Sequence, residues 1–272
     1  MFSMLRKVVL VFTVTLSVTL SSGNAQITDA ELTSIIRKAL TDESLGDVIL
    51  NKLNIFGPKK EIFSSHIKQM FENEVVMDAF VSEIVNAQTI FEQMPQAQIE
   101  SFAQEYSAAW FQEKAVRGVS RLPASDQRHF FALAIDIMRL VPADFCAGTM
   151  RNTIDSVTST HVEARALALL DDTKIARYLS ILRRSVAAEI SDDPLFIPLS
   201  PSEKKIAEQI YEQKFVDALL DHPRSEQLIA AAEMNDWTPD RDVCDFSILA
   251  LEVGLVVEGA VGDWVIRLLL AP

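Results

Sequence analysis

VPADFCAGTM, residues 141–150, places Cys146 a few residues after a proline in a chain that contains one other cysteine. That cysteine, Cys244, lies in TPDRDVCDF, residues 238–246, and it also follows a proline closely. Because proline favours the start of a helix and interrupts its interior, both cysteines are expected in the early turns of helices. A bond between them would therefore pin two helix starts together within the second half of the chain.

The first residues of the chain indicate the compartment in which such a bond could form. Arg6 and Lys7 precede the apolar stretch Val8–Leu20, and the small-residue segment SSGNA then favours cleavage after Ala25. The apolar stretch is shorter than the roughly 20 residues of a membrane-spanning helix, although an uncleaved anchor remains the alternative. We therefore predict that residues 1–25 are a secretory signal peptide and that the mature protein is exported, to a periplasm or to the extracellular space.

In an oxidising compartment, two cysteines in one mature chain most simply pair with each other, so the sequence predicts a Cys146–Cys244 disulfide. The bond would close a loop of 98 residues, for which the chain-entropy model gives a stabilisation of about 4–5 kcal/mol. A free reactive thiol is the alternative, but it needs a base and an electropositive setting. Asp144 and Asp245 stand directly beside or near the cysteines and make that setting acidic.

The net charge restricts the classes of partner. The whole chain carries −13 at pH 7, and removal of the signal peptide with its two basic residues makes the mature charge −15. Such a surface repels phosphate backbones and anionic lipids, so neither nucleic-acid binding nor membrane-surface binding is expected. The charge fits a protein partner that is basic, or solubility alone.

Capping residues mark the starts of two helices. Thr28 is followed three residues later by Glu31, which is the spacing of a capping box. Ser200, Pro201 and Glu203 have the same spacing, with proline at the first helical position. Helices are therefore predicted to begin at both places.

Helical periodicity runs through most of the mature sequence, and the whole chain has only eight glycines. In residues 59–80, for example, apolar side chains recur on one helical face, and no segment shows the alternation of a β-strand. We therefore predict an all-α fold, an irregular bundle of roughly ten or more helices. A break near Pro123 divides it into an N-terminal helical half, residues 26–122, and a C-terminal helical half, residues 123–272, which form either one body or two lobes.

The end of the chain, SILALEVGLVVEGAVGDWVIRLLLAP (residues 247–272), is very apolar but is interrupted by charges. Glu252, Glu258, Asp263 and Arg267 recur through it. Charged side chains are rare in membrane-spanning helices, so the segment predicts buried helices of a core. No transmembrane segment is expected in the mature chain.

Motifs that carry catalysis or bind cofactors do not occur in the sequence. The histidines His66, His129, His161 and His222 show no HExxH spacing, and the chain has no CxxC, GxSxG, SxxK, GxGxxG or GxxxxGK[ST] pattern. The best interpretation of His161 is a residue on a helix surface. We therefore predict no catalytic residue, no cofactor and no metal.

One cluster of carboxylates offers a weak calcium site. NDWTPDRDVCDF contains Asp236, Asp240, Asp242 and Asp245. The EF-hand pattern fails here, because the glycine and the glutamate that it requires are missing. Aspartates in the first turn of a helix are also favoured by the helix dipole without any metal.

Apolar residues stand in the clearest loop of the chain, DDPLFIPLSP, residues 192–201. Leu195, Phe196, Ile197 and Leu199 lie there among three prolines. Such a loop most simply tucks into the core, but an exposed loop of this kind would be the best contact patch in the chain.

Aromatic residues are frequent in the N-terminal half. They are Phe63, Phe71, Phe80, Phe91, Phe102, Trp110 and Phe111. Their spacing is typical of a helical core, and the alternative is a pocket for an apolar ligand.

These patterns favour a non-catalytic exported protein that binds a protein partner. An inhibitor or immunity-type protein that neutralises a basic toxin would fit, although this step is an analogy. Two other functions stay open: a helical carrier of a small apolar or lipid-like ligand, and an enzyme of the cell envelope whose site has no motif. A cavity would favour the first, and a pocket where a carboxylate and a histidine converge would favour the second.

Overall fold

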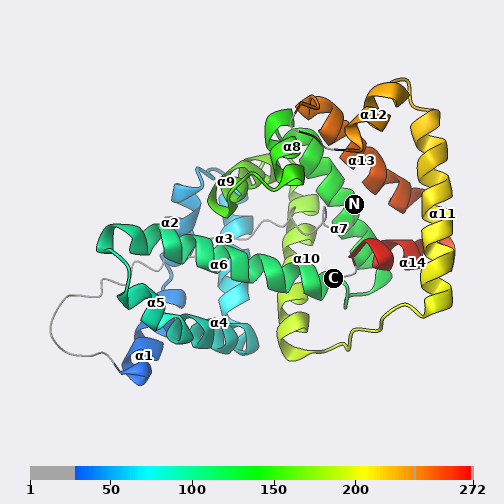
Figure 1. The fold of residues 1–272 in the computed structure, drawn as a ribbon. Coiled ribbons are helices and arrows are strands. Elements are labelled where there is room, and N and C mark those ends of the chain that lie inside the picture. Colours follow the sequence, from blue (N-terminus) through cyan, green and yellow to red (C-terminus); the bar gives the residue numbers. More distant parts are fainter. Residues whose placement is uncertain (1–27, 234, 236, 271–272) are drawn as a thin grey trace.

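The computed structural model describes residues 28–233, 235 and 237–270 (Figure 1). This part of the chain forms fourteen helices and no β-strand, so the prediction of an all-α bundle is confirmed. The helices are α1 (Asp29–Leu40), α2 (Leu45–Lys52), α3 (Lys59–Phe71), α4 (Glu74–Asn86), α5 (Gln88–Glu92), α6 (Gln96–Val119), α7 (Ala124–Leu140), α8 (Ala143–Arg151), α9 (Ser156–Leu167), α10 (Asp172–Ser191), α11 (Pro201–Leu220), α12 (Ser225–Ala231), α13 (Asp240–Val256) and α14 (Gly259–Leu270). The predicted signal peptide, residues 1–25, lies outside the described residues.

Both predicted capping boxes are present. The Thr28 hydroxyl accepts a hydrogen bond from the backbone N–H of Glu31 (3.3 Å), and the Glu31 carboxylate accepts one from the backbone N–H of Thr28 (3.0 Å). Ser200 and Glu203 make the same reciprocal pair, with Pro201 at the first helical position. Each box satisfies two backbone donors that the first turn of a helix leaves free, and α1 and α11 begin where the sequence predicts.

Helix α10 packs against helices from both halves of the sequence, namely α3, α4, α6 and α7 (Figure 1). Its contact with α6 is so close that a Cβ atom at Gly118 would lie 1.8 Å from the carbonyl oxygen of Ser185, so the position requires glycine. Buried apolar residues from Leu32 to Leu270 form one cluster. The two predicted halves therefore share a hydrophobic core.

The aromatic residues of the N-terminal half pack in that core, as the sequence indicates. Phe80 of α4 is fully buried. Its ring centroid lies 4.9 Å from that of Phe111 and 5.2 Å from that of Trp110, both on α6. The Phe71 ring of α3 lies 5.8 Å away. Direct ring contacts thus join three helices.

The apolar end of the chain forms α13 and α14, which are packed against other helices. Helix α13 contacts α7, α8, α11, α12 and α14. Gly259, the first residue of α14, has a φ angle of +67°, a conformation that glycine adopts without strain. Among the described helices, none combines the length and apolar character needed to cross a lipid bilayer.

Candidate functional site

The predicted disulfide is present between α8 and α13. The Cα atoms of Cys146 and Cys244 lie 5.6 Å apart, and both residues are buried. Each cysteine lies in the first two turns of a helix that follows a proline, Pro142 or Pro239. The disulfide therefore links two helix starts, and its buried position assigns it to the framework of the fold.

The carboxylates of the weak calcium candidate are bound by arginines. Asp240 accepts from Arg151 Nη1 (2.5 Å). Arg224 donates hydrogen bonds to the carboxylates of Asp242 and Asp245. The bond to Asp245 is 2.6 Å long. These pairs tie α13 to the end of α8 and to the start of α12. Asp236 lies outside the described residues. Within the part that the structure describes, no three histidine, cysteine or carboxylate side chains form a metal-binding group.

The segment between α10 and α11, residues 192–200, lies on the surface and is held in place by two arginines. Arg121, which forms ion pairs with Glu189 (2.8 Å) and Asp192 (2.6 Å), donates to the carbonyl oxygen of Pro194 (3.3 Å). Arg267 of α14 donates to the carbonyl oxygen of Ile197. The backbone of this loop is thus fixed at two points by residues far away in the sequence.

The fixed loop exposes part of its apolar content. Leu195 and Ile197 are 69% and 70% exposed. Phe196 is half-buried, and Leu199 packs against the core. The expectation that the loop tucks into the core is therefore wrong for Leu195 and Ile197. The reason is that Arg121 and Arg267 bind the carbonyl groups of Pro194 and Ile197 and hold the loop at the surface, where these two side chains are exposed.

A cavity of about 360 Å³ lies beside the exposed loop residues. Leu195 and Ile197 form part of its wall, together with Trp264 of α14 and Leu122, which follows α6. Arg121 and Arg267 also line it, although their guanidinium groups are engaged as described above. The exposed apolar side chains of the loop thus border this cavity.

The apolar surface continues along α11, which follows the loop directly. Four of its apolar side chains are exposed: Ile206, Ile210, Val216 and Leu220. At 3.6 residues per turn they fall within about one third of the helix circumference. The opposite face buries Ala207 and Tyr211. Together with Leu195 and Ile197, these four residues are called the apolar ridge below.

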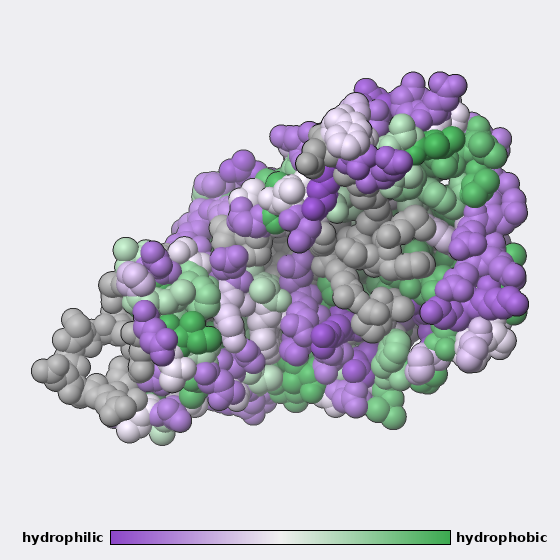
Figure 2. Space-filling view, in the orientation of Figure 1, coloured by the Kyte–Doolittle hydropathy of each residue, from purple (hydrophilic) through white to green (hydrophobic). Residues whose placement is uncertain are grey.

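Figure 2 places this surface in the context of the molecule. In this view hydrophilic residues cover most of the length of α11, and green apolar groups show near its upper end and at the right edge. Since single exposed apolar residues are common on soluble proteins, the informative feature is that four of them share one face of α11 and two more lie on the loop that precedes it.

Two buried ionisable side chains lie away from this surface. His66 of α3 is buried, and burial, aided by the nearby Arg183, lowers its pKa to about 3. Arg183 Nη1 lies 3.1 Å from His66 Nδ1, so the neutral imidazole accepts from the guanidinium. His66 is therefore a packed residue joining α3 to α10. His161, interpreted as a helix-surface residue, is half-buried on α9.

Glu163 of α9 is buried as well. Its Oε1 accepts from the Ser159 hydroxyl (2.7 Å), whereas Oε2 has no partner among the described residues. Burial raises the pKa of this carboxyl to about 8, and the Ser159 hydrogen bond offsets only part of the effect. The side chain is therefore protonated at neutral pH, and no histidine or second carboxylate is bonded to it in the described part of the chain.

Comparison with protein-family models, with curated proteins and with solved structures finds no match to this chain. Conclusions about function therefore depend on the residues and the geometry.

Sequence patterns indicated the loop but not the residues that support it. Arg267 and Asp263 are visible in the sequence as charges within an apolar segment. Nothing in the local pattern shows that Arg267 reaches residue 197, because the two residues are 70 positions apart. Trp264 gave no signal at all beyond that of an ordinary core residue.

Proposed function

We propose that this protein is an exported, non-catalytic helical protein that binds a protein partner through the apolar ridge. The observation that carries the proposal is the 192–200 loop, whose backbone is fixed by Arg121 and Arg267 while Leu195 and Ile197 are about 70% exposed. A loop that is already ordered loses little conformational entropy on binding, so its exposed apolar area contributes more of its free energy to affinity.

Export is supported by two features. The first 25 residues have the pattern of a signal peptide. The disulfide between Cys146 and Cys244 is of the kind that forms and persists in oxidising compartments.

The charge of the chain favours a basic partner. With a net charge of −13 for the whole sequence, long-range attraction would speed association with a positively charged protein. An inhibitor or immunity-type protein that neutralises a basic toxin has this character.

The test is affinity capture of the tagged mature protein from the native envelope fraction, with the captured proteins identified by mass spectrometry. We expect a stoichiometric partner that is retained by the parent and lost by the double variant Leu195→Asp/Ile197→Asp, since two charges then replace the apolar contact.

A matched control separates contact at the ridge from a general effect of surface charge. Leu169, in the turn between α9 and α10, is 69% exposed, as much as Leu195, and Leu169→Asp should leave capture unchanged. Equal loss in both variants, or retention of the partner by the double variant, would contradict the proposal. The association rate should also fall as salt is raised, because salt screens the attraction between opposite charges.

A further inference from the structure

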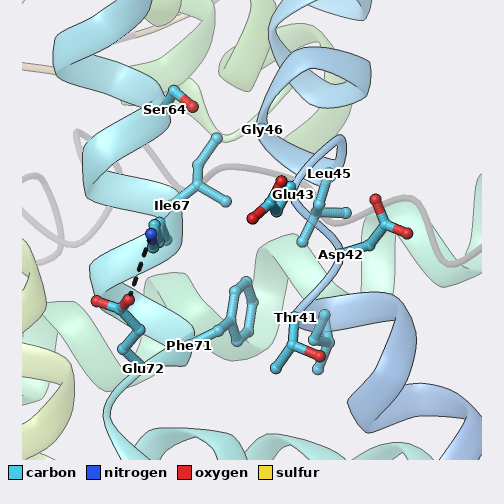
Figure 3. A pocket seen from close by; sticks show the side chains of 11 residues that line it. Thr41, Asp42, Glu43, Leu45, Gly46, Ser64, Ile67, Phe71 and Glu72 are labelled. Carbon is cyan, nitrogen blue, oxygen red and sulfur yellow. Dashed lines mark ion pairs between the residues drawn. The ribbon is translucent and has the colours of Figure 1, made fainter.

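A second cavity lies at the opposite end of the bundle, where α1, α2 and α3 meet (Figure 3). Its volume is about 390 Å³, within the range of small-molecule sites. It shares no lining residue with the cavity beside the 192–200 loop. The two hollows are therefore separate sites.

The helix contact at one end of this cavity explains its shape. At Gly46 a Cβ atom would lie 2.6 Å from the hydroxyl oxygen of Ser64, so α2 and α3 approach closely there. Figure 3 shows the hollow between the two helices on the Phe71 side of this contact. Gly46 thus permits the close approach of the two helices, and both Gly46 and Ser64 line the cavity.

The interior of the cavity is apolar. Ile67 and Phe71 lie one turn apart on α3 and line the same side, and Leu45 of α2 lies opposite them (Figure 3). Ile67 and Phe71 also belong to the hydrophobic core, with Leu45 packed against it. Since the core holds these side chains, the floor of the cavity is already formed before any ligand binds.

The rim of the cavity is negatively charged. Asp42, Glu43 and Glu72 line it, with Lys68 as the one lining cation. Lys68 forms an ion pair with Glu72, with 3.8 Å between Lys68 Nζ and Glu72 Oε1. Asp42 accepts hydrogen bonds from the hydroxyl (2.6 Å) and the backbone N–H (2.8 Å) of Ser44, which lower its pKa and keep it ionised. Asp42 is also attracted by Lys38, so Glu43 is the lining carboxylate for which the described residues provide no ion pair.

Glu43 is placed to meet a ligand. Its carboxylate extends over the gap between Leu45 and Ile67 in Figure 3. No described residue forms an ion pair with it, so it is available to a cation from outside. A bound ammonium group near this carboxylate would gain attraction, and an apolar body attached to it would displace water from the floor.

We propose that this cavity binds a small organic cation with an apolar body, of the class of alkylammonium and arylammonium ions. The apolar body of the ligand packs on Leu45, Ile67 and Phe71, and its ammonium group pairs with the Glu43 carboxylate. Anions are repelled by the rim. The site does not depend on the apolar ridge or on a protein partner.

Hexylammonium is the probe, and its binding is followed by NMR of the methyl groups of Leu45 and Ile67 in the isotopically labelled protein. We expect saturable shifts at these methyl groups. Hexanol, which has the same chain without charge, should bind about fivefold more weakly, because an ion pair at about 4 Å in water contributes on the order of 1 kcal/mol. Hexanoate should bind more weakly still.

Two variants test the role of the carboxylate. Glu43→Gln removes the charge from an exposed position and should weaken hexylammonium binding about threefold to fivefold, with hexanol unaffected. Glu61→Gln removes a charge from an exposed position on α3 that does not line the cavity, and it should leave the affinity unchanged. Equal melting temperatures of both variants and the parent would show that the fold is intact.

Three results would overturn the proposal: no saturable shift with hexylammonium, equal affinity for hexylammonium and hexanol, or the same affinity in Glu43→Gln as in Glu61→Gln. None of these results bears on the protein partner, because capture through the apolar ridge is measured separately.

Discussion

Helices α1–α6 and helices α7–α14 share one hydrophobic core but differ in the bonds that supplement it. In the first group the interior is held by aromatic rings, and Phe71, Phe80, Trp110 and Phe111 contact one another across α3, α4 and α6. In the second group a disulfide links α8 to α13. Arginine side chains there also bind backbone carbonyls and carboxylates at several helix ends.

Two arginines of the second group donate to backbone carbonyl groups on either side of α13. Arg151 donates to the carbonyl oxygens of Asn235 (3.2 Å) and Thr238 (2.6 Å), just before α13. Arg128 donates to those of Leu255 (3.3 Å) and Val257 (2.9 Å), at the end of α13. Both groups bury aromatic side chains, and the second group adds a disulfide and arginine bonds to backbone carbonyl groups.

The largest expected effect concerns the disulfide. The double variant Cys146→Ser/Cys244→Ser should lower the free energy of unfolding by about 4–5 kcal/mol, because the bond closes a 98-residue loop in the unfolded chain. Urea unfolding monitored by circular dichroism measures it. Reductant should produce a similar loss in the parent and none in the variant.

Measuring the loss of stability helix by helix would test whether the two groups of helices respond differently to reduction. Native-state hydrogen exchange in the reduced protein should show a larger loss of protection in α8 and α13 than in α4 and α6. Equal loss everywhere would mean that the two groups unfold as one unit, and an unchanged urea midpoint after reduction would show that the disulfide does not stabilise the fold.

The next effect concerns the aromatic interior of α1–α6. Phe80→Ala should lower the free energy of unfolding by about 3–5 kcal/mol, since it removes a fully buried ring and leaves a cavity among Phe71, Trp110 and Phe111. Thermal unfolding measures the change. Phe56→Ala is the matched control, because Phe56 is 65% exposed and its removal should change the stability by about 0.5 kcal/mol or less.

Sequence reasoning succeeded where a feature depends on neighbouring residues. The capping boxes at Thr28 and Ser200 follow from a spacing of three residues, and the disulfide follows from there being two cysteines in the chain. The all-α fold follows from the periodicity of apolar residues. The caps and the helices are determined by residues close together in the sequence, and the disulfide pairing is determined because only two cysteines are present.

The same reasoning failed where a feature depends on distant residues. Leu195 and Ile197 are exposed because Arg121 and Arg267 hold the loop backbone, and both arginines lie about 70 residues away. The cavity at α1–α3 depends on the close approach of Gly46 to Ser64, and Glu163 is buried by helices that pack on α9 from elsewhere in the chain. A single sequence contains no record of these pairings.

The last expected effect, whose size depends on the pH, lies where the two groups of helices meet. Helix α9 packs against α6 of the first group and α7 of the second, and it carries the buried Glu163. The pKa of this carboxyl is raised to about 8 in the folded protein, whereas a glutamate in an unfolded chain has a pKa of about 4.3. Between these values the folded state holds a proton that the unfolded state releases, so stability decreases as the pH rises from about 4.3 through 8.

Glu163→Gln removes this dependence, because the amide resembles the protonated carboxyl and does not ionise. The variant should therefore melt at a higher temperature than the parent at pH 8. The difference should shrink as the pH falls towards about 4.3 and vanish below it, where the parent is protonated in both states. Glu105→Gln, at an exposed position on α6, should show no such change with pH. Melting curves of the three proteins from pH 4 to pH 9 measure the effect. A variant less stable than the parent at pH 8 would mean that the ionised carboxylate of Glu163 finds a partner in the fold, and α9 would then join the two groups through a polar contact and not only through packing.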